Sequence, residues 1–280
     1  MVSAVAESSP RPGVLVVCPT PIGNLSDVTL RLLEELRRAD VVACEDTRRT
    51  RILLERHGIS APLLAVHEHN EAARAGELVE RIRSGQRVAL ATDAGMPAVS
   101  DPGARIVAAV AAAGLSVTVL PGPSAVTAAV AASGLGGSGF VFAGFLPRPA
   151  AKAAAEIRRL DASGLPVVAF ESPQRLPATL AALADAQPDR RAAVCRELTK
   201  LHEQVERGRL ADVAELFAAP PKGEITLVLA AARAAADAAD VPEDALAELV
   251  AAVGARRAAA LASRLTGVPR NRLYRASTKP

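Results

Sequence analysis

The chain has 280 residues, of which 50% are apolar and 22% are charged, with a net charge of +3. This length predicts about two domains that can each bury a core, and this balance excludes both a disordered chain and a mini-protein that needs disulfides. Five Phe, one Tyr and no Trp are too few aromatic side chains for a protein that holds nucleic acid mainly by base stacking. Three cysteines without a C-x-x-C spacing indicate neither a disulfide framework nor a thiolate zinc site.

Basic residues concentrate at the C-terminal end of the chain. Residues 251–280 contain seven basic residues and no acidic one, which leaves 26 basic and 30 acidic residues, a net charge of −4, in the remainder. A basic end on an acidic body suggests a polyanionic partner. The seven residues are Arg256, Arg257, Arg264, Arg270, Arg272, Arg275 and Lys279.

Neither a membrane span nor a secretory signal is expected. The longest apolar stretches, such as 106–113 and 125–132, are shorter than the roughly 18 residues that a transmembrane helix requires. The first residues include Glu7 and have no basic cluster before an apolar run. We therefore expect a cytoplasmic protein with no membrane partner.

The first half of the chain alternates short apolar runs with amphipathic segments. Strand patterns occur at 14–18, 41–44, 63–66, 87–92 and 116–120, and helical patterns near 30–36, 47–57, 71–84, 101–114 and 124–133. Five strand–helix units in succession predict a mostly parallel sheet with helices on both faces. We place this N-terminal α/β domain at 13–135.

The pattern changes after a glycine-rich stretch at 135–139. Strand patterns at 140–143, 167–170, 192–197, 204–208 and 226–229 are separated by only two or three helices, which predicts a mixed sheet with antiparallel pairs. We place this second α/β domain at 139–232 and a basic helical tail at 240–280, joined by an alanine-rich connector at 230–239. Within the tail, helices are expected at 256–265 and 270–275, with Leu261, Leu265, Val268, Leu273 and Tyr274 as its packed apolar residues.

The loops that follow the first five strands are rich in polar and turn-forming residues. In an open parallel sheet, ligands bind beyond the carboxyl ends of the strands, so these loops are the expected binding site. They contain neither a G-x-G-x-x-G fingerprint nor a G-x-x-x-x-G-K-[ST] loop, which argues against a dinucleotide or a nucleoside triphosphate. The loops span 19–24, 45–49, 67–70, 93–97 and 121–124.

These loops, with others in the second half, resemble the tetrapyrrole-methylase superfamily. Examples are Glu-Asp-Thr-Arg at 45–48 and His-Glu-His-Asn at 67–70. The similarity runs in order from about residue 13 to 275, and within the superfamily it is greatest to the methyltransferases of ribosomal RNA. The matching segments are 19–25, 45–48, 67–70, 93–95, 100–103, 121–125, 144–147, 171–173, 196–200 and 222–224.

The resemblance implies two α/β domains of the tetrapyrrole-methylase type, with S-adenosylmethionine bound in the cleft between them. It also implies a homodimer that methylates the ribose 2'-hydroxyl of a cytidine in the decoding centre of 16S rRNA, within the small ribosomal subunit. We expect no DNA partner. Two alternatives stay open: a tetrapyrrole C-methyltransferase of the same fold, and a non-catalytic RNA-binding factor of ribosome assembly.

The cofactor is a cationic sulfonium joined to adenosine and an amino acid, so its site needs backbone hydrogen-bonding groups, a polar contact for the ribose and an apolar slot. Asp93 at a strand end, followed by two small residues, meets part of that need. Asp101 before Pro102 is explained better as a helix N-cap. The expected cofactor residues are Pro21, Gly23, Asp93, Ala94, Gly95, Ser100, Pro121, Gly122, Ser124, Ala125 and Phe145.

A general base accelerates methyl transfer to a ribose hydroxyl, because it removes the hydroxyl proton. The sequence does not identify which residue is that base. Carboxylates, histidines and a lysine of the cleft motifs are the candidates, and each carboxylate could equally be an ion-pair partner of Arg48, Arg175 or Arg196. His67 and His69 have the spacing of a metal pair but no third ligand, and no metal is expected. The catalytic candidates are Glu45, Arg48, His67, Glu197 and Lys200, with Asp46, His69 and Glu171 as further possible bases.

Overall fold

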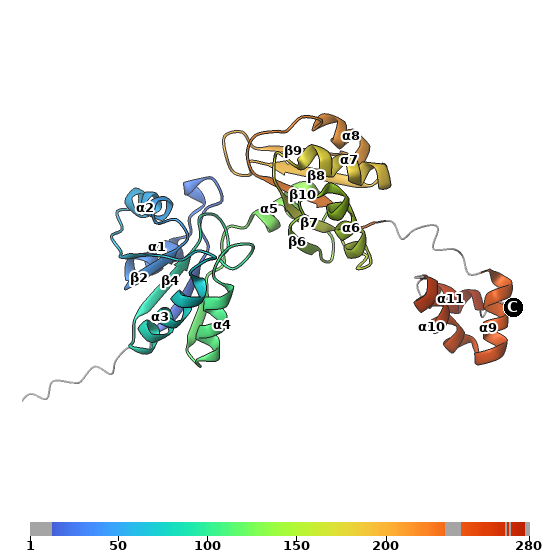
Figure 1. Ribbon diagram of the computed structural model, residues 1–280, viewed down its shortest axis with the longest axis horizontal. Coiled ribbons are helices and arrows are strands. Elements are labelled where there is room, and N and C mark those ends of the chain that lie inside the picture. The colour runs from blue at the N-terminus through green and yellow to red at the C-terminus, as the bar shows by residue number, and fades with distance from the viewer. Residues whose placement is uncertain (1–12, 233–241, 267, 269, 278–280) are drawn as a thin grey trace, which may run out of the picture. The chain divides into compact units, whose positions relative to one another are not determined.

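The computed structural model describes residues 13–232, 242–266, 268 and 270–277. Two compact units divide the chain: one comprises residues 1–160 and 165–230, the other 161–164 and 231–280. The first unit contains two five-stranded sheets, and the second contains the C-terminal helices (Figure 1). Among the described residues, no helix combines the length and apolar character that crossing a membrane requires.

The first sheet is wholly parallel, as predicted, with the order β3-β2-β4-β1-β5. Its three central strands, at 14–18, 41–44 and 87–91, are almost wholly buried apolar runs, as expected for strands covered on both faces, whereas the edge strand at 116–119 is mostly exposed. Its strands are β1 (Val14–Cys18), β2 (Val41–Cys44), β3 (Leu63–Ala65), β4 (Arg87–Ala91) and β5 (Ser116–Val119).

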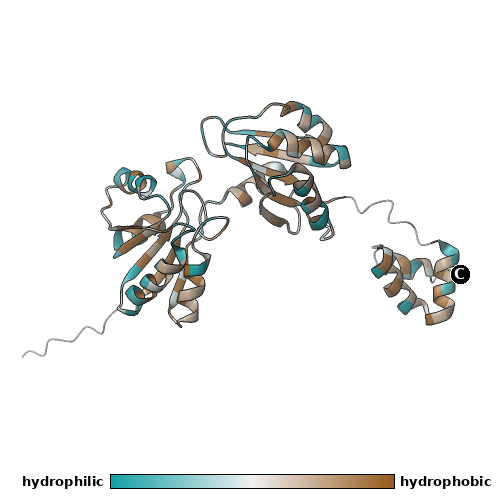
Figure 2. Ribbon diagram, viewed as in Figure 1, coloured by the Kyte–Doolittle hydropathy of each residue, from teal (hydrophilic) through white to brown (hydrophobic). Residues whose placement is uncertain are grey.

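Helices cover both faces of this sheet. Leucines of α1 (Leu30–Arg38) and α2 (Thr47–Arg56) pack on one face, and the apolar stripes of α3 (Glu71–Arg83) and α4 (Ala104–Ala112) pack on the other. Figure 2 shows mostly hydrophobic strands, with hydrophilic residues concentrated on helices and loops around them. This arrangement confirms the predicted layers.

The second sheet is mixed, also as predicted, with the order β6-β7-β10-β8-β9. β6 and β7 are parallel, whereas β10 pairs antiparallel with both β7 and β8, and β8 with β9. The elements are β6 (Val141–Phe145), α6 (Ala150–Asp161), β7 (Val167–Glu171), α7 (Leu176–Ala186), β8 (Arg191–Arg196), β9 (Gln204–Arg209), α8 (Leu210–Leu216) and β10 (Ile225–Leu229).

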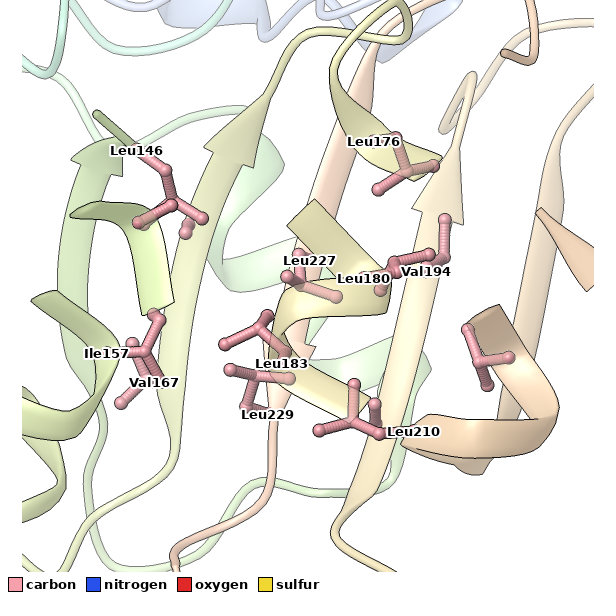
Figure 3. Close-up of a cluster of buried hydrophobic side chains, with 14 of the residues drawn as sticks. Leu146, Ile157, Val167, Leu176, Leu180, Leu183, Val194, Leu210, Leu227 and Leu229 are labelled. Atoms are coloured by element: carbon pink, nitrogen blue, oxygen red, sulfur yellow. The ribbon is translucent and has the colours of Figure 1, made fainter. Parts of the chain in front are cut away.

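The two faces of the second sheet are covered differently. One face carries α6, α7 and α8, whose apolar side chains, such as Ile157, Leu180 and Leu210, pack against strand residues such as Val194 and Leu227 (Figure 3). The other face receives α5 (Ala125–Ser133), whose Val126 and Ala129 pack on Val168 and Val228. The sequence pattern placed this helix with the first sheet, which was wrong. Its small side chains let it lie close against the second sheet instead.

The C-terminal unit contains α9 (Glu243–Val253), α10 (Ala255–Thr266) and α11 (Arg270–Ser277). Its core contains Leu246, Ala259, Ala262, Val268 and Leu273. The prediction of an apolar core was therefore correct for Val268 and Leu273 but wrong for three side chains. Leu265 is 81% exposed, and Leu261 and Tyr274 are 38% and 40% exposed, because alanines on the opposite face of α10 make the close helix contact.

Candidate active site

A pocket of about 390 Å³ lies where loops of the first sheet meet strand ends of the second. The first sheet contributes the loop after β4 and the start of α5. The second contributes the ends of β6 and β7 and the entry to β10. The lining residues are Ile22, Ala94, Gly95, Met96, Val99, Ser100, Asp101, Ser124, Ala125, Val126, Phe145, Phe170, Glu171, Ser172, Pro173, Gly223, Glu224, Ile225 and Thr226.

The loops after β1 and β4 are tied to each other beside this pocket. Thr20 and Gly95 exchange two backbone hydrogen bonds of 2.9 and 3.0 Å, and the Thr20 hydroxyl donates to the Thr92 carbonyl. These strands are neighbours in the sheet, so their carboxyl ends lie at one edge. The cross-link holds Ile22 and Gly95 against the pocket.

The segment from Gly95 to Gly103 has an unusual backbone. Ala98 and Ser100 have positive φ values of 69° and 62°, which non-glycine residues seldom adopt, and Gly103 has φ 133°. The buried carboxylate of Glu71, the first residue of α3, accepts hydrogen bonds from the Gly103 and Arg105 amides at 2.9 Å. A side chain from another helix thus satisfies the first amides of α4 and anchors this segment.

This geometry corrects the prediction for Asp101. The N-cap of α4 is Gly103, and the helix begins at Ala104. Asp101 instead lines the pocket. Burial is the main cause that raises the pKa of the Asp101 carboxyl to about 6. A hydrogen bond with Thr92 lowers this pKa, and the nearby negative charges of Glu45, Asp93 and Glu224 raise it further. This pocket carboxyl, with its raised pKa, was missed because Asp-Pro has the local pattern of a helix start.

Six of the predicted cofactor residues line the pocket. Ser124 occupies the N-cap position of α5, where no cap was expected, yet its side chain makes no capping hydrogen bond. Phe145 is 61% exposed and its ring lies 5.4 Å from that of Phe170, at 57°. The six residues are Ala94, Gly95, Ser100, Ser124, Ala125 and Phe145.

The other five predicted cofactor residues lie outside the lining. Pro21 and Asp93 border a smaller cavity of about 60 Å³ beside α2. A Cβ on Gly122 would lie 2.5 Å from the Pro19 side chain, so this glycine allows the loops after β1 and β5 to pack together. Pro121 stands beside it, and Gly23 faces Lys200 of the second sheet. Their cofactor contacts remain predictions.

Asp93 joins β4 to the start of α2. Its carboxylate accepts the Asp46 amide at 3.0 Å and lies 3.5 Å from the Arg49 guanidinium. Asp46 in turn caps α2 through the Arg48 amide and holds the Arg48 side chain by two further bonds, which lower the pKa of its carboxyl to about 2. Arg48 is 86% exposed. Glu45 accepts a longer bond of 3.3 Å from the Thr92 hydroxyl.

His67 and His69 lie in the exposed turn after β3. Their rings are 6.1 Å apart and edge-to-face, and the His67 Nε2 lies 3.1 Å from the Asn70 amide nitrogen. Within the described ranges, no group of three or more His, Cys, Asp or Glu residues is arranged to hold a metal ion. Both histidines are exposed, and neither lines the pocket.

Glu197 and Lys200 form a charge cluster beside the pocket. The Lys200 ammonium lies 2.8 Å from Glu197 and 2.9 Å from Glu224, and Glu197 also accepts the Glu224 amide. Hydrogen bonds with these carboxylates raise the pKa of Lys200 against the lowering effect of its partial burial. Lys200 thus stays a cation and orients Glu224, the cluster residue that lines the pocket.

Glu171 is a buried carboxylate with a full set of partners. It pairs with Arg175 and accepts hydrogen bonds from the Thr179 hydroxyl and the Ser172 amide. This environment fits a structural role at the pocket wall. The motifs at 171–173 and 222–224 identified this wall in sequence, although most of their residues were not assigned to the site.

The pocket suits a cationic organic donor. Its volume lies in the range of about 300 to 1,000 Å³ that small-molecule sites occupy. Small residues such as Ala94 and Ala125 expose backbone, Val99 and Phe170 supply an apolar wall, and the lining contains three carboxylates but no Lys or Arg. S-adenosylmethionine, a sulfonium with an adenine ring, fits these features, whereas a polyphosphate does not.

The fold and the pocket are those of a methyltransferase built from two β-sheets that are covered by helices. Residues 14–214 match the family of Tetrapyrrole (Corrin/Porphyrin) Methylases, and residues 234–278 match the RsmI C-terminal HTH domain. The chain belongs to the tetrapyrrole methylase family, and its methyl donor is S-adenosylmethionine.

Relatives named ribosomal RNA small subunit methyltransferase I match most of the chain. That of Mesorhizobium japonicum is 44% identical over 269 residues, covering 95% of this chain and 92% of the relative. That of Thermotoga maritima is 43% identical, covering 78% of this chain and 98% of the relative. That of Escherichia coli O157:H7 is 39% identical, covering 94% of each.

Solved structures share the fold at low identity. The methyltransferase CobJ has a TM-score of 0.60 at 20% identity, covering 79% of this chain and 95% of its own. Uroporphyrin-III C-methyltransferase from Thermus thermophilus, complexed with S-adenosylhomocysteine, has a TM-score of 0.55 at 20% identity, covering 77% of this chain and 96% of its own. These likenesses confirm the predicted fold class.

Proposed function

We propose that the protein transfers a methyl group from S-adenosylmethionine to the ribose 2'-hydroxyl of a cytidine in the decoding centre of 16S rRNA. The observation that carries the ribosomal RNA substrate is the match to ribosomal RNA small subunit methyltransferase I along both the methylase unit and the C-terminal helices. The choice of ribose, cytidine and decoding centre rests on the motif resemblance. The pocket lining contains no basic residue, which suits a cationic donor, and the Arg48 side chain is exposed on α2, which suits RNA contact.

The C-terminal unit is the proposed phosphate-binding surface. Arg256, Arg257 and Arg264 on α10 are exposed, as are Arg270 and Arg275 on α11, and neither helix contains an acidic residue. Arginines that contact phosphates hold and orient RNA without reading its sequence. Arg272 and Lys279 complete the predicted basic set, but their side chains lie outside the described part of the structure.

The rim formed by α2 and the turn after β3 is the proposed side of RNA entry. Arg48 is exposed and pairs with Asp46 at the start of α2. His67 and Glu68 are exposed in the turn that follows β3. β2 and β3 are neighbours, so the loops that follow them share one edge. Arg48→Ala is expected to lower RNA methylation while the calorimetric affinity for S-adenosylmethionine stays constant, whereas equal loss of both would assign Arg48 to the donor site.

The direct test is incubation with small ribosomal subunits and S-adenosylmethionine labelled in its methyl group, followed by nucleoside mapping. A labelled 2'-O-methylcytidine in the decoding centre is the expected product. Label on a base, or on a carboxylate-rich tetrapyrrole supplied instead of RNA, would overturn the ribose assignment. Binding of subunits without donor binding would favour a non-catalytic assembly factor.

The role of the C-terminal unit is tested by removing it. Deletion of 240–280 is expected to leave donor binding intact, weaken subunit binding and flatten its dependence on salt. Replacement of Arg256, Arg257 and Arg264 by alanine removes three positive charges without removing the helices, and is expected to reduce the slope of log affinity against log salt by about 2 to 3. The matched control replaces the exposed Arg31, Arg38 and Arg158 of the first unit. An unchanged slope for the α10 variant would remove these arginines from RNA binding.

We also propose a homodimer that acts in the cytoplasm, where small subunits are assembled. The resemblance to the family supports both statements. Light scattering on the purified chain gives the test for the first, since its mass is 28.8 kDa per protomer.

A further inference from the structure

Asp101 is a carboxyl of the pocket lining, two residues before the N-cap of α4. It is half-buried at the pocket wall, and the Gly103 amide, which an N-cap at Asp101 would bond, already donates to Glu71. Among the ion pairs of the described residues, none includes Asp101. The charged groups that face it are carboxylates: Glu45 after β2, Asp93 after β4 and Glu224 before β10.

We propose that Asp101 is the general base that accepts the proton of the ribose 2'-hydroxyl during methyl transfer. This inference rests on the proposed function and adds the residue that performs its proton transfer. Asp101 lines the pocket of the proposed donor site, and a hydroxyl that approaches the methyl group in that pocket would meet its carboxylate. The Gly95–Gly103 segment, anchored by Glu71, fixes the position of Asp101.

The other two carboxylates of the pocket lining are less suited to this task. Glu171 is saturated by Arg175, Thr179 and Ser172. Glu224 is paired with Lys200. Asp101 lacks such a cation, and its pKa of about 6 lies close to working pH, which is the condition for efficient proton acceptance.

The transfer balances without any other reactant. The Asp101 carboxylate takes the hydroxyl proton as the ribose oxygen donates an electron pair to the methyl carbon. The sulfur–carbon bond breaks with its electron pair remaining on sulfur, which becomes a neutral thioether. The products are the methylated ribose, S-adenosylhomocysteine and a protonated Asp101, which returns its proton to solvent.

The test compares Asp101→Asn with wild type in single-turnover methylation of small ribosomal subunits across pH 5 to 8. The wild-type rate is expected to fall about tenfold per pH unit below a midpoint near 6, because the base becomes protonated there. Asp101→Asn is expected to lose about 10² to 10⁴ in rate at pH 7.5 and to lose the acid limb. Its calorimetric affinity for S-adenosylmethionine is expected to stay within about threefold of wild type. Asp185→Asn, at an exposed position of α7, is the matched control.

The outcomes separate this inference from the proposed function. If wild type places no 2'-O-methyl group on subunits, the proposed function fails. If wild type does so but Asp101→Asn keeps its rate and acid limb, the base assignment fails alone. A large loss of donor affinity in Asp101→Asn would make Asp101 a donor ligand and also overturn it. Should Asp101→Asn unfold in a thermal melt, Asp101→Glu is measured, for which an unchanged midpoint and rate would count against the proposal.

Discussion

Glu71 is expected to be the main anchor of the pocket segment, and its replacement tests that view. Both of its bonds, to the Gly103 and Arg105 amides, end on one oxygen, Oε1, at 2.9 Å. A hydrogen bond to a charged group contributes about 1.5 to 3 kcal/mol, and a buried amide left without a partner costs about 1 to 3 kcal/mol. The Gly103 bond is buried and the Arg105 bond only partly so. Glu71→Ala is therefore expected to destabilise the first unit by about 3 to 4 kcal/mol.

Glu71→Gln provides the discriminating comparison. An amide oxygen can accept both backbone bonds, but without the negative charge that favours a helix N-terminus, so the expected loss is about 1 kcal/mol. The measurements are urea unfolding by circular dichroism and hydrogen exchange of the Gly103 and Arg105 amides. Glu68→Ala, at an exposed neighbouring position, is the control. If Glu71→Ala changed the free energy of unfolding by less than about 0.5 kcal/mol and left both amides protected, the anchoring argument would be refuted.

Two further predictions follow from close packing. Gly223→Ala is expected to weaken S-adenosylmethionine binding by about tenfold in calorimetry, because φ is +95° there and a Cβ would lie 2.4 Å from the Glu197 side chain. Gly114→Ala is the control, since Gly114 has φ +69° but open space around it, and this change is expected to leave the affinity unchanged. Burial raises the pKa of Cys18 to about 12 and of Cys195 to about 11, so a thiol reagent at pH 8 is expected to react with neither until urea unfolds the chain, and rapid labelling of the native protein would contradict their burial.

Local patterns in the sequence were sufficient for the layers of the fold. The apolar runs of β1 and β4 and the leucines of α1 specify buried strands and an amphipathic helix, because those signals depend on neighbours in the chain. The loops at the strand ends were identified for the same reason, since the carboxyl ends of parallel strands share one edge.

The placement of chemistry within those loops depended on contacts between distant residues. Asp101 has the local pattern of a cap, but Glu71, thirty residues earlier, bonds the amides at that helix start and leaves Asp101 at the pocket. Asp93 follows a strand like a ligand-binding residue, yet it bonds the start of α2.

The sequence by itself determined the parallel and mixed types of the two sheets, the basic C-terminal end and the motifs that contribute to the pocket. Only the tertiary structure decided that α5 covers the second sheet and that Asp101 faces the pocket. It also decided that alanines of α10, rather than Leu261 and Leu265, form the core between the C-terminal helices. The physical reason is that small side chains and polar loop residues fit several environments at similar cost, so the choice among them is made by long-range packing and by whichever distant group satisfies each buried amide.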